Sequence, residues 1–354
     1  MKKKDKFKTI GQNPKIKNLK LNNYDDLHDW ESSQDQKKKS TKKPLRKGES
    51  SLKSCLSLRQ GRVVEIMTNY QYLVMIENEY KKCSLSGRLK YLDHIERNPI
   101  GVGDFVQVDE RPHCDYRIEE ISPRKNIFTR FIEKSQEEII LATNIDQIVV
   151  ISSAKHPIFN ANLLDRYLCL AEISQIPVLI CINKIDLLDD RTEIINECNY
   201  YKKMGYPIVY TSTISGEGIT ELKELLKDKE SLFTGKSGTG KSSIINTIEP
   251  AFQLKVGEIS NFHQKGKHTT SFSRMITWNF GGKLIDTPGL KTLGLKRDDL
   301  PKVSSCFPGF RPYSLRCTFN NCSHLHEENC AVKVVINKDI PPERYASYVK
   351  IRGI

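Results

Sequence analysis

A glycine-rich segment ending in lysine and serine, at positions 235–242, is the strongest candidate for chemistry in this sequence. It has the form G-x-x-x-x-G-K-S, in which backbone N–H groups surround a phosphate chain and the next helix adds its positive dipole end. Lys241 is expected to contact the β- and γ-phosphates, and Ser242 to bind Mg²⁺. A glycine-rich turn without a ligand is the alternative, but an apolar strand precedes this segment and a helix-forming run follows it. The expected phosphate-binding residues are Gly235, Lys236, Ser237, Gly238, Thr239, Gly240, Lys241, Ser242 and Ser243.

A D-T-P-G segment follows the apolar strand end 283–285. Paired with a phosphate loop, this pattern is typical of an aspartate that holds Mg²⁺ through water and a glycine N–H that contacts the γ-phosphate. We assign these roles to Asp286 and Gly289. The next residue is Leu290, which cannot orient the attacking water as a glutamine does. Slow intrinsic hydrolysis, accelerated by a partner, is therefore expected.

The polar segment 257–273 is interpreted as the first switch, a loop that closes over the γ-phosphate. A threonine hydroxyl there should complete the Mg²⁺ coordination. The sequence does not separate Thr269 from Thr270, and we assign Thr270. His268 is the nearest candidate for positioning the water, with a phosphate or RNA contact as its alternative role.

An N-K-I-D segment comes directly after the expected strand 177–182. An aspartate here can accept both the N1–H and the 2-amino group of guanine, a pair that adenine does not offer. A loop after another expected strand, beginning at Ser212 and Thr213, can supply a backbone N–H to guanine O6. The expected guanine-binding residues, which favour GTP over ATP, are Asn183, Lys184, Ile185, Asp186, Ser212 and Thr213.

The order of these motifs differs from that of an ordinary small GTPase, in which the phosphate loop comes first. Here the N-K-I-D segment precedes the phosphate loop, and D-T-P-G comes last. A sheet stays intact when its termini are moved, provided that the original ends lie close together. The sequence therefore predicts a circularly permuted G domain whose D-T-P-G segment continues directly into the C-terminal part.

Cysteine and histidine recur near the C-terminus as C-x₄-C-x-H-x₅-C. Three thiolates and one imidazole form a closed, tetrahedral zinc site with no open position for chemistry. A Pro-rich segment with few apolar residues needs such support. His326 could replace the nearer histidine, and Cys306 is a remote alternative. The expected ligands of one structural zinc are Cys317, Cys322, His324 and Cys330.

Two different patterns of secondary structure are expected before this cysteine cluster. Five short alternating strands are expected between about 58 and 125, typical of a small OB-type barrel, although a sandwich would give the same pattern. From about 140, strands alternate with helices such as 162–174 and 219–227, which predicts a parallel sheet covered on both faces. We place the domain boundaries at 1–57 (basic arm), 58–128 (OB fold), 129–297 (G domain) and 298–354 (zinc domain).

The chain has 354 residues and a formal net charge of +13. Residues 1–50 hold 15 Lys and Arg against 7 Asp and Glu, so the arm carries much of this excess. Such a segment is expected to be disordered when free and suits nucleic acid, or acts only as a solubilising tail. The absence of long apolar runs excludes membrane spans. Scattered single cysteines indicate a reducing compartment, so a cytoplasmic location is expected. The chain is also expected to be a monomer.

With these motifs together, residues 58–354 resemble the bacterial ribosome small subunit-dependent GTPase A family, RsgA. The resemblance rests on the permuted order, on G-K-S-G-T-G-K-S-S, G-K-H-T-T and D-T-P-G, and on the Cys/His spacing. It implies a factor in late 30S maturation that binds 16S rRNA near the decoding region, with GTP hydrolysis to GDP stimulated by the ribosome. Departures are Lys267, Thr213, Ser271 and the long arm. Gly238 replaces the asparagine of potassium-activated relatives, so no potassium requirement is expected.

Two competing functions are open at this point. The chain could be an RNA-binding scaffold that uses GTP only for stability, or an ATP-dependent P-loop enzyme. The second conflicts with Asn183 and Asp186, and the first would show no stimulation by the 30S subunit.

Overall fold

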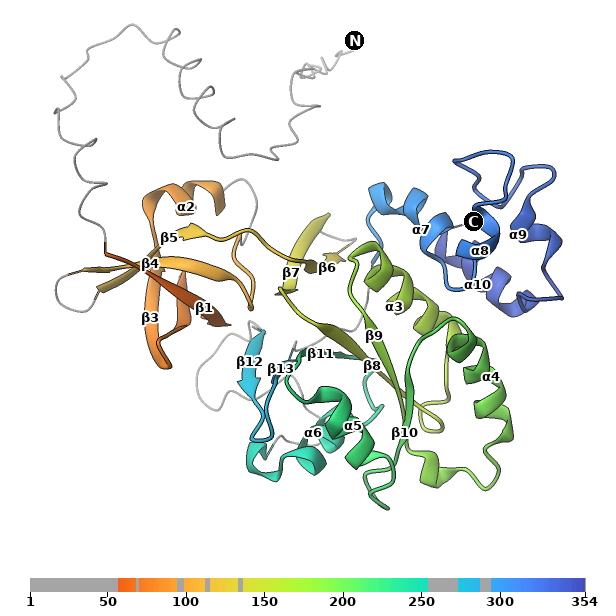
Figure 1. Cartoon of the computed structure of the whole chain (residues 1–354), viewed down its shortest axis with the longest axis horizontal. Coiled ribbons are helices and arrows are strands. Elements are labelled where there is room, and N and C mark those ends of the chain that lie inside the picture. Colours follow the sequence, from red (N-terminus) through yellow and green to blue (C-terminus); the bar gives the residue numbers. More distant parts are fainter. Residues whose placement is uncertain are drawn as a thin grey trace, which may run out of the picture. The chain divides into compact units, whose positions relative to one another are not determined.

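The computed structural model describes residues 57–353 except 68–69, 94–98, 112–114, 133–135, 254–272 and 287–293 (Figure 1). The basic arm, most of the first switch and the end of the D-T-P-G segment lie outside these residues.

The first described part is a closed five-stranded barrel. Antiparallel pairs join β1 to β2, β2 to β3, β1 to β4 and β4 to β5, and a parallel pair between β3 and β5 completes the ring. Alternate side chains of β2 point inward, as a half-buried strand requires. The closure confirms the predicted OB-type barrel and excludes the sandwich. The bounds are β1 Leu58–Ile66, β2 Gln71–Ile76, β3 Glu79–Leu85, the unforeseen helix α2 Gly87–Asp93, β4 Phe105–Arg111 and β5 Asp115–Ile121.

A hairpin follows the barrel and forms a separate two-stranded sheet. Its strands are β6, Ile127–Ile132, and β7, Glu137–Thr143. Phe131 of β6 also forms an antiparallel bridge with Gly294, far along the chain. The sequence did not predict this hairpin, and the expected boundary at 128/129 falls within β6.

The central part is an α/β sheet in the strand order β10-β9-β8-β11-β13-β12. The first five strands are parallel and β12 is antiparallel to β13. The strands are β8 Gln147–Ser153, β9 Val178–Asn183, β10 Ile208–Thr211, β11 Glu230–Thr234, β12 Arg274–Thr277 and β13 Lys283–Asp286. The helices are α3 Ala161–Ile173, α4 Thr192–Lys203, α5 Ile219–Leu226 and α6 Lys241–Ile248.

Successive residues of β8 point to opposite faces of the sheet, and each face carries its own core. Ile148 and Val150 pack with side chains of α3 and α4, whereas Val149 and Ile151 pack with side chains of α5 and α6. The middle of this strand, 148–151, is therefore apolar at every position, as expected for a strand covered on both faces. Helix α4 was not predicted.

The strands of the barrel and those of the α/β part belong to one 11-stranded sheet. Strand β1 pairs antiparallel with β12 at Glu65 and Arg274, whose side chains also form an ion pair of 3.4 Å. The sheet is therefore continuous across the expected domain boundary.

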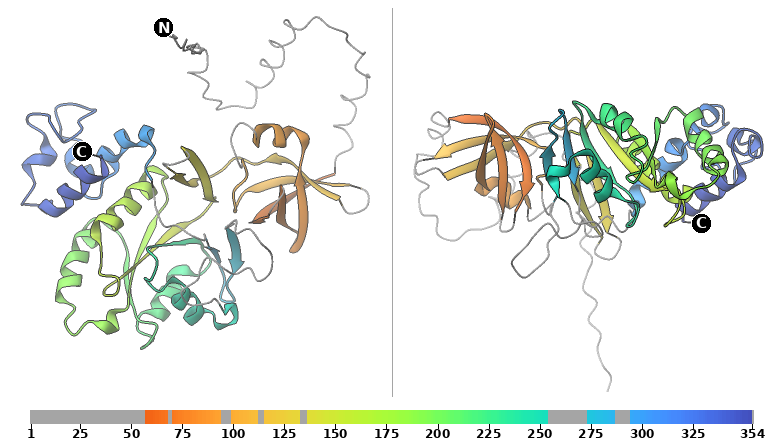
Figure 2. Two further views of the ribbon diagram at one scale, coloured as in Figure 1. Left: turned by 180° about the vertical axis from the view of Figure 1, so that it is seen from behind. Right: turned by 90° about the horizontal axis from the view of Figure 1, so that it is seen from below.

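The C-terminal helices, blue in Figures 1 and 2, lie beside α3. Phe307, Phe310 and Tyr348 form an aromatic core that also contains Cys169 of α3. The helices are α7 Leu300–Cys306, α8 Arg311–Ser314, α9 Ala331–Val334 and α10 Pro342–Ile351.

A buried ion pair fixes α10 to the α/β part. Arg344 donates to Asp165 Oδ2 at 2.7 Å and to the Tyr201 hydroxyl at 2.8 Å, and Tyr201 donates to Asp165 Oδ1 at 2.8 Å. Asp165 is fully buried in α3. Its burial raises the pKa of this carboxyl to about 6, although Arg344 opposes the shift.

Arg344→Ala should destabilise the protein by about 3–5 kcal/mol, because the variant leaves the Asp165 carboxyl buried without its cation. Urea unfolding followed by circular dichroism measures the effect. Lys350→Ala, an exposed change in the same helix, is the matched control. Equal unfolding midpoints for the two variants would contradict a stabilising role for the ion pair.

Candidate functional site

The candidate site lies at the carboxyl edge of the parallel strands. Because β8, β9, β10, β11 and β13 run in one direction, the segments that follow them meet at one edge. The N-K-I-D segment follows β9, the Ser212 loop follows β10, and the phosphate loop follows β11, while Asp286 ends β13. The fold thus brings together four motifs that are far apart in sequence.

Two glycines of the phosphate loop occupy positions where no side chain fits. Gly235 has φ +146°, and a Cβ there would lie 2.1 Å from the Ile151 carbonyl oxygen. At Gly240, with φ +92°, a Cβ would lie 2.3 Å from Asn183 Nδ2. These close approaches curl the backbone into the turn that opens α6, whose N-terminus favours an anion.

The Lys241 ammonium group lies within the turn of the phosphate loop. Its Nζ donates to the carbonyl oxygens of Gly235 at 2.8 Å and Lys236 at 3.0 Å. Burial lowers the pKa of Lys241 to about 8, and the nearby Asp286 opposes the shift. Burial likewise raises the pKa of Asp286 to about 6 against the effect of Lys241. The two side chains, each partly buried, are suited to a phosphate bound together with a divalent cation.

The N-K-I-D segment is tied to the phosphate loop by its first two side chains. Asn183 is fully buried; its Nδ2 donates to the Thr239 carbonyl oxygen at 2.9 Å, and its Oδ1 accepts from Thr211 at 3.1 Å. Lys184 Nζ donates to the Gly238 carbonyl oxygen at 2.6 Å. Asp186 is exposed and forms no ion pair in the part of the chain that the structure describes.

The Ser212 loop is closed by its own hydrogen bonds. Ser212 N donates to the Glu217 carbonyl oxygen at 3.0 Å, and Ser212 Oγ accepts from the backbone N–H groups of Ile214 and Ser215. Gly218 leaves no room for a side chain, since a Cβ would lie 1.9 Å from the Tyr210 carbonyl oxygen. The loop is therefore a defined turn beside the N-K-I-D segment.

A segment that the sequence did not single out also lies at this edge. Ser153, the last residue of β8, donates through Oγ to the carbonyl oxygen of Pro157 in the following loop at 2.6 Å. In the same loop, the His156 carbonyl oxygen accepts from Lys184 Nζ. Pro157 lines a small pocket with Lys236 and Thr239. The sequence could have indicated this loop only through its position after a parallel strand, because the loops after the other parallel strands all carry a nucleotide-binding motif.

Several assigned residues lie outside the described residues: His268, Thr269, Thr270, Gly289 and Leu290. Their roles remain predictions. The described residues of the nucleotide site lie in the phosphate loop, at the end of β13, and on the adjacent N-K-I-D and Ser212 segments.

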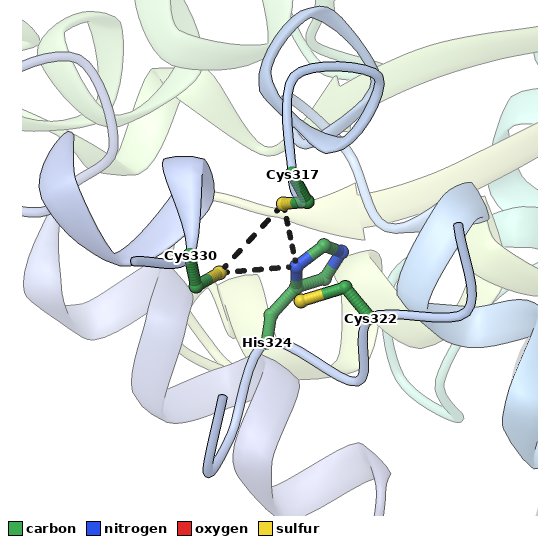
Figure 3. A group of neighbouring side chains, drawn as sticks. All are labelled: Cys317, Cys322, His324 and Cys330. Atoms are coloured by element: carbon green, nitrogen blue, oxygen red, sulfur yellow. Dashed lines mark hydrogen bonds between the residues drawn. The ribbon is translucent and has the colours of Figure 1, made fainter. Parts of the chain in front are cut away.

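The Cys/His motif converges on one point near the C-terminus (Figure 3). His324 Nδ1 lies 3.6 Å from Cys317 Sγ and 3.3 Å from Cys330 Sγ, and the two sulfurs are 3.9 Å apart. Together with Cys322, the ligand atoms all lie within 4.8 Å of one another. Zinc–sulfur bonds of about 2.3 Å place two sulfurs of a tetrahedron about 3.8 Å apart, so the group fits zinc. Neither His326 nor Cys306 belongs to this group.

Glu327 and Tyr345 support the loop that carries these ligands. Although burial raises the pKa of Glu327, backbone N–H donors, including those of Ser323 and Leu325, lower it to about 2. The Tyr345 hydroxyl donates to the His324 carbonyl oxygen at 2.7 Å. These contacts fix the backbone between the second and fourth ligands.

Comparisons with known proteins agree with this geometry. The family model described as RsgA GTPase matches residues 121–296. A protein of Phocaeicola vulgatus named "Small ribosomal subunit biogenesis GTPase RsgA" is 38% identical over 289 residues, 80% of this chain and 93% of the relative. The chain belongs to the RsgA GTPase family. An RsgA of Caldanaerobacter subterraneus is 37% identical over 295 residues, 82% of this chain and 94% of its own.

Two solved structures show the same fold. The crystal structure of YjeQ from Thermotoga maritima has a TM-score of 0.67 at 32% identity, covering 84% of this chain and 98% of its own. YloQ, described as a circularly permuted GTPase, has a TM-score of 0.62 at 28% identity, covering 84% and 94%. The predicted fold class and GTP-hydrolysing activity are confirmed, and the family uses guanine nucleotide and Mg²⁺.

No helix within the described residues is both long and apolar enough to cross a bilayer.

Purified protein should contain about one zinc per chain, because a Cys₃His group of this geometry binds zinc strongly. Elemental analysis should show loss of zinc in His324→Ala and retention in His326→Ala, which is two residues away and outside the ligand group. Cys330→Ser and Cys306→Ser form a second matched pair. Equal zinc contents in both members of a pair would contradict the assignment.

Binding of GDP should take up a proton at pH 8.5. The pKa of Lys241 is about 8 in the structure, so much of it is neutral at that pH, whereas the phosphates favour its charged form and raise its pKa. Affinity should therefore fall as pH rises above 8, by at most about tenfold per unit. Calorimetry in two buffers of different ionisation heat measures the uptake.

The same calorimetry at pH 7 is the reference, because Lys241 is then already charged and Asp286, with a pKa of about 6, is already mostly ionised. Identical heats in both buffers at pH 8.5 would show that Lys241 gains no proton on binding.

Proposed function

We propose that this GTPase acts in late maturation of the small ribosomal subunit, binds the 30S particle through 16S rRNA, and leaves after hydrolysis. Curated relatives that match most of the chain are named small ribosomal subunit biogenesis GTPases. The observation that carries the proposal is the conjunction of this family membership with a phosphate loop whose Thr239 carbonyl oxygen is hydrogen-bonded to Asn183 of a guanine-type N-K-I-D segment. A cytoplasmic monomer remains part of the proposal.

The proposed roles follow from the positions of the side chains. Lys241 and the phosphate-loop N–H groups bind the phosphates, and the Asp186 carboxylate accepts from guanine. Ser242, Thr270 and Asp286 hold Mg²⁺, which when bound draws charge from the β- and γ-phosphates. Gly289 contacts the γ-phosphate and His268 positions the water, both as sequence-based assignments. Cys317, Cys322, His324 and Cys330 hold the structural zinc.

The barrel and the C-terminal part supply the proposed RNA contacts. The barrel exposes Tyr80 and Phe105 with Arg88 and Lys90, a combination of aromatic and basic side chains that can stack on bases and bind phosphates. The C-terminal part exposes Phe319. The formal net charge of +13 supports a polyanionic partner. The basic arm is a further proposed RNA contact.

The proposed domains keep the boundaries 58–128, 129–297 and 298–354, preceded by the arm. The hairpin β6–β7 joins the first two, since it follows the barrel and bridges to Gly294 after the D-T-P-G segment.

Purified 30S subunits should stimulate GTP hydrolysis by at least about tenfold, because the chain has no glutamine after D-T-P-G and a partner must supply part of the catalytic arrangement. Phosphate release with 30S subunits, with 50S subunits and with neither measures this. Lys241→Ala should reduce stimulated turnover by about 100-fold or more. Lys202→Ala, an exposed change on α4, is the control.

Turnover that 30S subunits leave unchanged would favour the RNA-binding scaffold instead. Unchanged turnover in Lys241→Ala would show that this phosphate loop does not catalyse the reaction.

A further inference from the structure

An exposed ion pair joins the two loops that we assign to guanine binding. Arg191 Nη1 and Nη2 donate to Glu217 Oε1 at 2.7 Å and Oε2 at 3.1 Å. Arg191 lies five residues after Asp186, and Glu217 lies in the Ser212 loop. Two parallel N–H···O bonds of this kind fix the guanidinium in direction as well as in distance.

Both partners extend from backbone that is already ordered. Arg191 lies at the start of α4, where Asp190 Oδ1 accepts from the Thr192 backbone N–H at 2.9 Å and from its hydroxyl at 2.7 Å. The Glu217 carbonyl oxygen is bonded to Ser212 N, and its own N–H donates to Ser215 Oγ at 3.4 Å. Because other hydrogen bonds already hold the backbone at both residues, the ion pair mainly fixes the positions of the two side chains.

The Arg191 guanidinium also lies within electrostatic reach of Asp186. Its pKa is raised first by Glu217 and further by the charge of Asp186. The other cation of this segment, Lys184, is bonded to carbonyl oxygens of Gly238 and His156. If Glu217 were removed, the Arg191 guanidinium would be free to turn to Asp186.

We propose that Glu217 holds Arg191 so that the guanidinium does not pair with Asp186, which keeps that carboxylate free to accept the two N–H groups of guanine. Asp186 is exposed and its ion-pairing capacity is unused among the described residues, which is the state that base binding requires. Glu217 is then a positioning residue for nucleotide specificity. The inference rests on the proposed guanine contact of Asp186.

The proposal predicts that Glu217→Ala and Arg191→Ala have different effects on guanine binding. A clamp, meaning an ion pair that only holds the two loops together, predicts equal effects. Removing either partner of a clamp breaks the same contact and has the same effect. Here, Glu217→Ala releases a cation that competes with guanine for Asp186, whereas Arg191→Ala removes the competitor together with the contact. Only the first change should weaken guanine binding.

Equilibrium binding of fluorescent GDP to the full chain tests this asymmetry. Glu217→Ala should weaken GDP binding about two- to fivefold, the range of exposed ion pairs, and Arg191→Ala should change it by less than about 1.5-fold. The double variant should regain the affinity of Arg191→Ala. Glu221→Ala, an exposed acidic residue of the following helix α5, controls for net charge.

Salt dependence supplies a second readout that a structural defect would not show. The loss in Glu217→Ala should shrink as NaCl rises from about 0.05 M to about 0.5 M, because salt screens the competing attraction between Arg191 and Asp186. Thermal unfolding of each variant confirms that the fold is retained.

Equal losses in Glu217→Ala and Arg191→Ala, or a double variant as weak as Glu217→Ala, would overturn the proposal in favour of a clamp. No loss in Glu217→Ala would overturn it outright.

Asp186→Asn separates this inference from the function on which it rests. That variant should prefer XDP to GDP, and adding Glu217→Ala to it should leave XDP binding unchanged, since no charge remains at 186 for Arg191 to pair with. Unaltered GDP binding in Asp186→Asn alone would instead refute the guanine contact itself. An effect of Glu217→Ala that persists in the Asp186→Asn background would refute only the role of Glu217.

Discussion

The buried amide of Asn183 joins two parts of the nucleotide site. It reaches the phosphate loop through Thr239 and the strand of the Ser212 loop through Thr211. An amide can do this because it presents a donor and an acceptor at once. Gly240 is required beside it, since any side chain there would overlap the amide nitrogen. The Asn183 side chain and the absence of a side chain at Gly240 therefore together fix the spacing between the base-binding and phosphate-binding segments.

The circular permutation leaves this arrangement intact because it depends on strand order in the sheet, not on order along the chain. Parallel neighbours β8, β9 and β11 carry the loops whose contacts surround Asn183 and Lys184. The permutation instead changes which part of the chain follows β13. After Asp286 and the segment 287–293, Gly294 bridges to the hairpin strand β6, and Lys296 pairs with Glu138 at 3.4 Å.

Local patterns predicted the motifs, the barrel strands and most helices of the G domain, because spacing and apolar periodicity express them directly. Helix α4, Thr192–Lys203, was missed because it is only moderately apolar and contains adjacent tyrosines. The hairpin was missed although its own pairing is local, and only its bridge to Gly294 is non-local.

Contacts between residues that are far apart in the chain could not be predicted from the sequence either. Asp165 and Arg344 are separated by 179 positions, and nothing near either residue indicates the other. The loop after β8 carries no motif, so only the sheet shows that it touches the phosphate loop. The Arg191–Glu217 pair likewise emerges only when two strands place their loops together.

The pairing of β1 with β12 makes the barrel a cover for an otherwise open sheet edge. Arg274 of β12 meets Glu65 there, and a slip of one residue would turn the side chains of β12 to the opposite faces. A G domain cut away from its barrel would expose this edge, and unpaired edges recruit other chains. The OB-type barrel thus occupies a sheet edge that would otherwise be open to pairing with another chain.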